Sequence, residues 1–294
     1  MSDYHLHLHE HGAGSGGPPP GVYPPGHIDR YVEAALARGI TEIGFTEHLY
    51  RCVESGPVLG RWWEREPEPR LSAELGAWIG LERTLSLERY VEVVLDAKAR
   101  GLPVKLGLEV DFIPGTEQAV LDLLDGIPFD YLVGSVHWIG GWNFMRDSAR
   151  AEYVRRGADV AFRQYFELET SLASSGIVDA LAHVDIIERH RIRPEGSLAE
   201  PYDAVVAAAA ATGTAVEVSS AGLRHTIGRI YPAPDLLARF HAAEVPITLA
   251  SDAHLAEDAG WGHAEVVAAA RAAGYRAHNR YAAREPIVTP LPEI

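Results

Sequence analysis

The chain has 294 residues, of which 47% are hydrophobic, and a formal net charge of −15. This length is typical of a single α/β barrel, and the hydrophobic fraction excludes a chain that is disordered throughout. The acidic balance argues against a nucleic-acid partner, because phosphate backbones require basic surfaces, but it permits a small anionic substrate beside bound metal ions.

Short hydrophobic segments alternate with amphipathic helical segments along the chain, a pattern typical of parallel βαβ units. The expected strands are 4–8, 42–46, 104–110, 131–136, 180–184, 215–219 and 247–251. The expected helices are 27–38, 87–100, 116–124, 154–174, 201–212, 234–243 and 262–273. Several helices end at a glycine, such as Gly39 or Gly176, which suits a left-handed cap leading into the next strand. The order predicts an α/β barrel with seven units instead of eight.

Two stretches interrupt this alternation. Residues 12–26 are rich in glycine and proline, and residues 49–83 hold Trp62, Trp63 and Trp78 among charged side chains. Long loops within a compact domain are usually functional. We expect a long loop insertion at 49–83, whose tryptophans either pack the loop onto the barrel or face the substrate.

Histidines and acidic residues recur where the expected strands end. They are His5, His7 and His11 with the first strand, His48 after the second, Glu109, His137 and His183 at the ends of the third to fifth, and Asp252 and His254 after the seventh. The carboxyl ends of parallel barrel strands meet at one rim, so we expect these side chains to converge. Imidazole and carboxylate groups together predict a metal site. A purification-tag remnant is the less favoured explanation of the first histidines, because tags are usually unbroken histidine runs.

The order of these motifs resembles that of the polymerase and histidinol phosphatase (PHP) superfamily. The motifs are His-x-His, Thr-Glu-His, Gly-x-Glu, Ser-Val-His, Ala-His-Val-Asp and Ser-Asp-Ala-His. Residues 107–117, 129–137, 221–224 and 231–234 are most similar to the histidinol-phosphate phosphatase branch. The resemblance spans nearly the whole chain. It implies that residues 1–294 form one distorted (β/α)7 barrel with parallel strands, an active site at their C-terminal ends and up to three metal ions.

The resemblance also implies how the ligands are shared among the ions. The first ion would take His5, His7, Glu109 and Asp252; Glu109 would bridge to a second, completed by His137 and His183; and the third would take His11, His48 and His254. His9 is the alternative to His11, because alternation keeps it on the side of His5 and His7 only while the strand continues straight. Two or three divalent ions are expected, and the mixed ligands suit Zn, Mn or Fe.

Such a cluster suits phosphate ester hydrolysis. Clustered divalent ions lower the pKa of a shared water, so that a hydroxide can attack phosphorus without a covalent intermediate. Arg224 matches the arginine of the family's Ala-Gly-Leu-Arg stretch and is the leading candidate to bind the phosphate, followed by Arg189. Asp252 or His254 could supply the proton that the leaving alkoxide needs.

Other polar residues next to the ligands have supporting roles or none. Four acids could orient the imidazoles through hydrogen bonds: Glu47, Asp111, Asp185 and Glu217. His225 adjoins Arg224 and is the one remaining histidine that could face the site. Cys52 is the single cysteine and is expected to be a packed thiol. With no disulfide, signal peptide or membrane-spanning run in the sequence, we expect a cytoplasmic protein without a membrane partner.

The sequence thus predicts a metal-dependent phosphatase acting on a small phosphate ester, with L-histidinol phosphate as the substrate that the resemblance implies. Another phosphate ester or a nucleotide, cleaved by a phosphodiesterase of the same superfamily, is the first alternative. The second is a barrel whose metals serve only structure. The complete set of candidate ligands counts against this last possibility, since a degenerate site should have lost some.

Overall fold

Parallel strands form a ring in the computed structural model, which describes residues 1–12, 17–146 and 149–293. One sheet has the order β1 (Ser2–Leu6), β2 (Glu42–Phe45), β3 (Val104–Leu106). The other has the order β10 (Ile247–Ala250), β9 (Ala215–Ser219), β8 (Ala180–Leu181), β5 (Val133–Ser135), β4 (Glu109–Asp111). All strand pairings within these two sheets are parallel, as predicted. Residues 13–16 of the predicted 12–26 loop lie outside the described residues.

Two single bridges join the two sheets into a ring. Leu6 pairs with Ala253 just beyond β10, where the backbone N–H of His7 donates to the Ala253 carbonyl at 2.7 Å. On the other side of the ring, His48, just beyond the central strand β2, pairs with Glu109 at the start of the edge strand β4. Both closures therefore fall within the motifs that predict the metal site. The ring agrees with the predicted distorted (β/α)7 barrel.

The third predicted strand, 104–110, is divided into β3 and β4, which together occupy one position of the ring. β3 pairs with β2, whereas β4 pairs with β5, so the chain changes partner between them. Gly107 lies at this change, and a Cβ atom there would come within 2.5 Å of the Tyr131 ring. The close approach of that ring explains why the position holds glycine.

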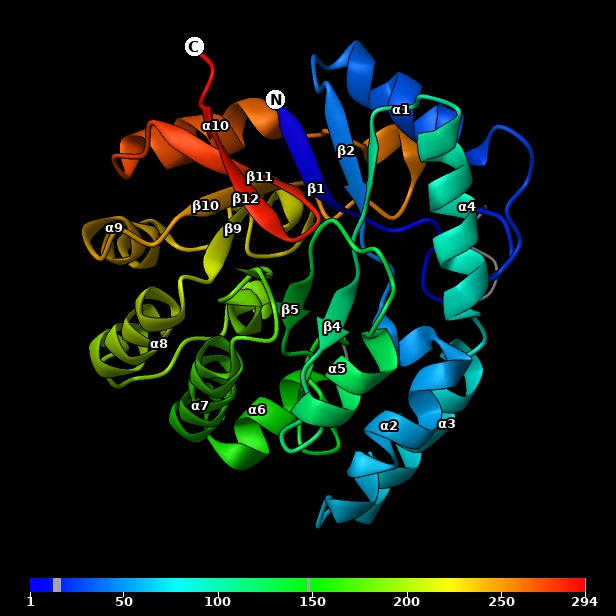
Figure 1. The fold of residues 1–294 in the computed structure, drawn as a ribbon. Helices are drawn as coiled ribbons and strands as arrows, with labels where there is room; N and C mark the ends of the chain where they lie inside the picture. Colours follow the sequence, from blue (N-terminus) through cyan, green and yellow to red (C-terminus); the bar gives the residue numbers. More distant parts are fainter. Residues whose placement is uncertain (13–16, 147–148, 294) are drawn as a thin grey trace.

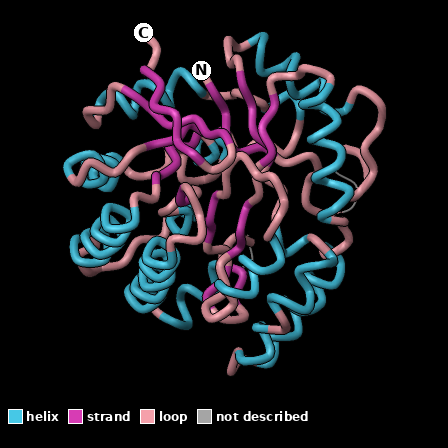
Figure 2. The backbone as a smooth tube through the Cα atoms, viewed as in Figure 1, coloured by secondary structure: helices cyan, strands magenta, loops and turns pink. Residues whose placement is uncertain are grey.

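Helices surround the ring on its outside (Figures 1 and 2). The predicted helices correspond to α1 (His27–Ala37), α4 (Leu87–Ala99), α5 (Glu117–Leu124), α7 (Ala158–Ser175), α8 (Ala199–Thr212), α9 (Pro234–Ala242) and α10 (His263–Ala272). α4 illustrates why they form, because the Ser86 side chain accepts from the Arg89 N–H at its start and Tyr90 and Val94 are buried one turn apart. The predicted helix 154–174 is wrong in its beginning: Gly157, at φ 82°, separates α6 (Arg150–Arg156) from α7.

The segment 49–83 is largely helical, so the prediction of a long loop is wrong. It contains η1 (Leu49–Arg51), η2 (Val53–Ser55), α2 (Gly56–Leu59), η3 (Trp62–Arg65) and α3 (Pro69–Glu82). Leu71, Leu75 and Ile79, spaced four residues apart, are the buried stripe of α3. α2 and α3 lie together beyond α5 at the lower edge of the molecule in Figure 1.

Two antiparallel hairpins have no counterpart in the predicted elements. One is β6 (Trp138–Ile139) with β7 (Trp142–Asn143), and the other is β11 (Ala277–Ala282) with β12 (Glu285–Pro290). The second hairpin, red in Figure 1, crosses the ring beside β1. Its Tyr281 packs on Tyr4 and Tyr131 near the starts of β1 and β5, with ring centroids 5.8 and 5.6 Å away. This hairpin covers the end of the ring opposite the polar rim.

Cys52 is buried and free, which confirms the expected packed thiol. Across the described residues, no helix combines the length and the apolar character that crossing a membrane requires.

Candidate metal centre

The structure brings the nine predicted ligands to one end of the ring. Four overlapping groups place their ligand atoms within 4.8 Å of one another: His7, His48 and His254; His5, Glu109 and His183; His5, His7 and Asp252; and His48, Asp111 and His137. The remaining predicted ligand, His11, has its Nε2 atom 3.2 Å from Nε2 of His48.

The four residues predicted to hold the first ion, His5, His7, Glu109 and Asp252, have the spacing of ligands around one ion. Nε2 of His5 and Nε2 of His7 are 3.1 Å apart. The Oε2 atom of Glu109 lies 3.3 and 3.4 Å from these two nitrogens, and Oδ1 of Asp252 lies 3.7 and 3.5 Å from them. Two ligands of a tetrahedral ion, each about 2 Å from it, are separated by about 3.3 Å. These four side chains therefore fit a shared divalent ion.

Glu109 faces a second group with its other oxygen. Oε1 lies 3.5 Å from Nε2 of His137 and 3.3 Å from Nε2 of His183. Both oxygens are buried and accept no hydrogen bond from any residue that the structure describes. Burial raises the pKa of Glu109, but the imidazoles of His48, His5 and His137 outweigh it and hold this pKa well below its usual value. Oε2 also lies 2.8 Å from Nδ1 of His48. An ionised carboxylate whose two oxygens face different sets of imidazoles is suited to bridge two cations.

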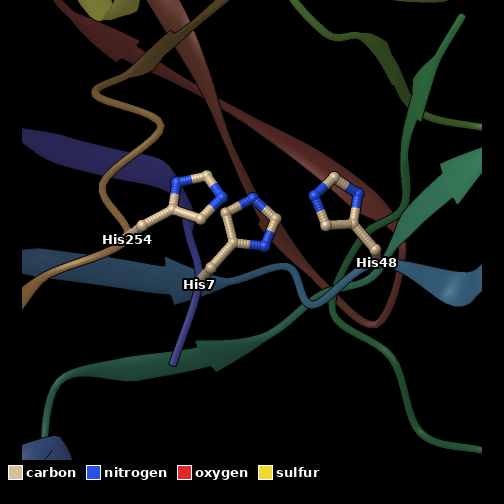
Figure 3. A group of neighbouring side chains, drawn as sticks. All are labelled: His7, His48 and His254. Carbon is tan, nitrogen blue, oxygen red and sulfur yellow. The ribbon is translucent and has the colours of Figure 1, made fainter. Parts of the chain in front are cut away.

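His7, His48 and His254 form a group made only of imidazoles. The ring of His7 stacks against His48 at 4.4 Å and against His254 at 4.2 Å between centroids (Figure 3). Burial and the adjacent His7 hold the pKa of His254 well below its usual value. The Nε2 atom of His254 is buried and has no hydrogen-bond partner among the described residues. A neutral imidazole with an unpartnered nitrogen can act as a ligand.

His9 and His11 have different surroundings, which bears on the choice left open by the sequence. His9 lies 3.1 Å from Glu47 through Nδ1 and 3.2 Å from the Val22 carbonyl through Nε2. Both of its nitrogens thus have partners outside the cluster. His11 instead directs Nε2 toward His48, so the geometry favours His11 as the third N-terminal ligand.

Three of the four acids suggested as orienting partners contact predicted ligands. Glu217 lies 2.7 Å from Nδ1 of His5, Asp111 lies 2.8 Å from Nδ1 of His137, and Glu47 accepts the Leu8 N–H at 2.8 Å and lies 3.9 Å from Nδ1 of His7. The contacts of Glu217 and Asp111 turn Nε2 of His5 and of His137 toward the cluster. Glu47 is too far from Nδ1 of His7 for a hydrogen bond and holds the backbone at Leu8 instead.

The suggestion for Asp185 is wrong. Its Oδ2 atom accepts from the Arg229 guanidinium at 2.8 Å and from the Ala233 N–H at 2.7 Å. Asp185 thereby ties the end of β8 to the start of α9, and it orients no imidazole among the described residues.

Asp3 supports the centre in a way that the sequence analysis missed. Its buried carboxylate accepts hydrogen bonds from the Ser251 N–H at 2.8 Å, the Ser251 hydroxyl at 2.6 Å and the Gly260 N–H at 2.8 Å. These contacts hold the segment that carries Asp252 against β1. Asp3 lies two residues before His5, on the same side of the strand, and this alternation was the available signal.

A cavity of about 440 Å³ opens beside the cluster, lined in part by His137, His183, Asp252 and His254. Both predicted phosphate-binding arginines, Arg224 and Arg189, and also His225 line the same cavity. Nη2 of Arg224 donates to the Ser251 and Asp252 carbonyls at 2.6 and 2.7 Å. Its Nη1 atom has no hydrogen-bond partner among the described residues and lies 3.9 Å from Oδ2 of Asp258, which lines the same cavity. Arg224 can therefore hold the Asp252 segment and still bind an anion.

Aromatic side chains form another wall of the cavity. Tyr50 and Trp78, from the segment 49–83, stack with ring centroids 5.3 Å apart, and Trp138 meets Tyr50 edge-on at 5.1 Å. Trp62 and Trp63 are buried in the core instead. Of the two roles considered for these tryptophans, packing thus applies to Trp62 and Trp63, and Trp78 faces the cavity.

Comparison with known proteins agrees with this geometry. The PHP domain family matches residues 25–221. A Deinococcus radiodurans protein named "probable histidinol-phosphatase" is 31% identical over 94% of this chain and 95% of its own length, and the Bacillus subtilis histidinol-phosphatase is 25% identical over 80% and 90%. The fold is similar to that of a Lactococcus lactis histidinol phosphate phosphatase solved with zinc, L-histidinol and phosphate. The TM-score is 0.72, and the two chains are 21% identical over 97% of this chain and 98% of the other. With this site and these relatives, the chain belongs to the PHP domain family.

Proposed function

We propose that this chain is a metal-dependent phosphatase that hydrolyses L-histidinol phosphate to L-histidinol and phosphate. One observation carries the proposal: the two oxygens of Glu109 face two different sets of imidazoles in a cluster beside a cavity that two arginines also line. The similarity to a "probable histidinol-phosphatase" over 94% of this chain supports this choice of substrate.

The nine clustered residues would hold two or three divalent ions, with Zn, Mn or Fe suited to their mixed ligands. When bound, such ions lower the pKa of a water molecule and neutralise charge on a phosphoryl group. Glu217 and Asp111 would keep the imidazoles of His5 and His137 in place while this charge changes.

The arginines would bind and orient the phosphoryl group. Nη1 of Arg224 can donate a hydrogen bond to one phosphate oxygen while Nη2 keeps its two backbone contacts. Arg189 lines the same cavity, and the contact of its Nη1 with Sδ of Met145, at 3.8 Å, is weak enough for an anion to replace. Asp252 and His254 also line this cavity. Because the pKa of each is held well below its usual value, neither carries an acidic proton near neutral pH, and the proton that the leaving alkoxide oxygen needs would come from water.

The test is phosphate release from L-histidinol phosphate by purified protein. Chelated samples and samples reconstituted separately with zinc, manganese or iron are assayed beside a panel of other phosphate monoesters and a nucleotide phosphodiester. We expect turnover only in the metal-containing samples and the highest kcat/KM for L-histidinol phosphate. A higher kcat/KM for another ester would refute the substrate, and full turnover after complete metal removal would refute the metal-dependent reaction.

A further inference from the structure

We propose that Glu82, the last residue of α3, is a positioning residue for His11, so that the segment 49–83 controls binding of the third ion, which His11, His48 and His254 are predicted to hold. Oε2 of Glu82 lies 3.3 Å from Nδ1 of His11, and the Tyr50 hydroxyl, from the same segment 49–83, also lies 3.3 Å from this nitrogen. On the other side of the same ring, Nε2 of His11 lies 3.2 Å from Nε2 of His48. A carboxylate on one nitrogen of an imidazole fixes the tautomer and directs the other nitrogen toward the metal.

His11 needs such a partner more than the other predicted ligands do. It lies on a loop beyond β1, and its side chain is 36% exposed, whereas those of His5 and His7 are 0% exposed. Oε1 of Glu82 also accepts the Gly12 N–H at 2.9 Å. One carboxylate therefore holds both the ring of His11 and the backbone that follows it.

Arg51, at the other end of the segment, completes this support. Its guanidinium is fully buried and donates to the His9 and Glu10 carbonyls, both at 3.0 Å. Its Nε atom lies 3.3 Å from Oε2 of Glu82, so the two charges compensate each other. The loop before and after His11 is thus bound to two residues of one helical segment, and the placement of α3 sets the position of His11.

The first experiment measures divalent-ion affinity without substrate. Glu82→Ala and Glu82→Gln are compared with the wild type and with Glu74→Ala, a control on the exposed side of α3 whose partner is Arg70. Zinc is titrated into chelated protein, and bound zinc per chain is measured by elemental analysis. We expect Glu82→Ala to lower the affinity for the most weakly held zinc ion by about 10- to 100-fold. The loss of affinity in Glu82→Gln should lie near the low end of that range, and Glu74→Ala should bind zinc as tightly as the wild type.

A double-mutant cycle separates positioning from general destabilisation. This inference rests on the proposed role of His11 as a ligand, so Glu82→Ala should have no further effect on zinc affinity in a His11→Ala background. An equal loss in both backgrounds would overturn the proposal, as would wild-type zinc affinity in Glu82→Ala. If Glu82→Ala does not fold, unchanged affinity in Glu82→Gln overturns it instead. Because no substrate is present, these outcomes do not depend on whether L-histidinol phosphate is the substrate.

Discussion

Replacing Arg224 with alanine should weaken phosphate binding by an amount that the structure allows us to work out. Nη2 is already engaged with two carbonyls, so Nη1 is the group left to bind a phosphate oxygen. One charge-assisted hydrogen bond contributes about 1.5–3 kcal/mol. The loss of this bond corresponds to a decrease of about 10- to 150-fold in kcat/KM. The loss of this one bond should appear mainly as a higher KM, because the contact is to the phosphoryl group of the substrate. Alanine also removes the two bonds to the Ser251 and Asp252 carbonyls, and any displacement of Asp252 that results should lower kcat.

The assay compares substrate turnover with inhibition by inorganic phosphate. The inhibition constant of phosphate should rise by a similar factor, since phosphate tests this contact without the rest of the substrate. The kcat/KM of Arg224→Lys should fall between those of the wild type and Arg224→Ala, because one ammonium group cannot keep both carbonyl contacts and also reach the phosphate. Arg89→Ala, which removes an exposed pair with Glu92, is the control. If KM, kcat and the phosphate inhibition constant of Arg224→Ala all stay close to wild type, Arg224 does not bind the phosphoryl group.

Two further predictions concern the centre and the core. Asp252→Asn and His137→Ala should each abolish turnover with little change in the circular dichroism spectrum; substantial activity in both would contradict the proposed ligands. Burial raises the pKa of Glu169 well above its usual range, although Tyr165 donates a 2.7 Å hydrogen bond that opposes this shift. The folded protein therefore keeps the Glu169 proton at pH values where the unfolded chain has lost it. The contribution of Glu169 to the unfolding free energy is fully present in acid and is lost as the pH rises through the folded pKa. Glu169→Gln should therefore gain unfolding free energy relative to wild type between about pH 5 and about pH 8 in denaturant titrations. A gain that does not change with pH, or an equal change in the exposed control Glu167→Gln, would refute this reasoning.

The parts of the fold that were predictable from sequence are those with regular hydrophobic patterns. The strand predicted at 215–219 has the bounds of β9, because five residues buried on a ring strand give an unbroken signal. α3 was missed although Leu71, Leu75 and Ile79 have helical spacing, since glycines and charged residues between them weaken the pattern. The hairpin of β11 and β12 was also missed. β12 is mostly exposed, so its pairing with β11 leaves little trace in hydrophobicity.

For the candidate site, the sequence predicted which residues meet and, with Glu217 and Asp111, part of what holds them. Residue type and strand position were sufficient to predict that the nine candidate ligands converge, since parallel strands end on one rim. Partners such as Glu82 lie far along the chain from the ligand that they contact, and their surroundings become visible only in three dimensions. The same holds for the two nitrogens of His9, whose contacts with Glu47 and Val22 favour His11 over His9 as the predicted ligand.

The hydrogen bonds of Asp3 have a consequence for the order of folding. They join residues 248 positions apart, so the edge of β1 that faces β10 stays without its neighbour until nearly the whole chain has been synthesised. At about 5–20 residues per second, that delay is about 12–50 s. An unpaired strand edge is a site for aggregation during this interval. Metal capture should therefore come late: the nascent chain must first close its ring before His5 and Asp252 can share an ion.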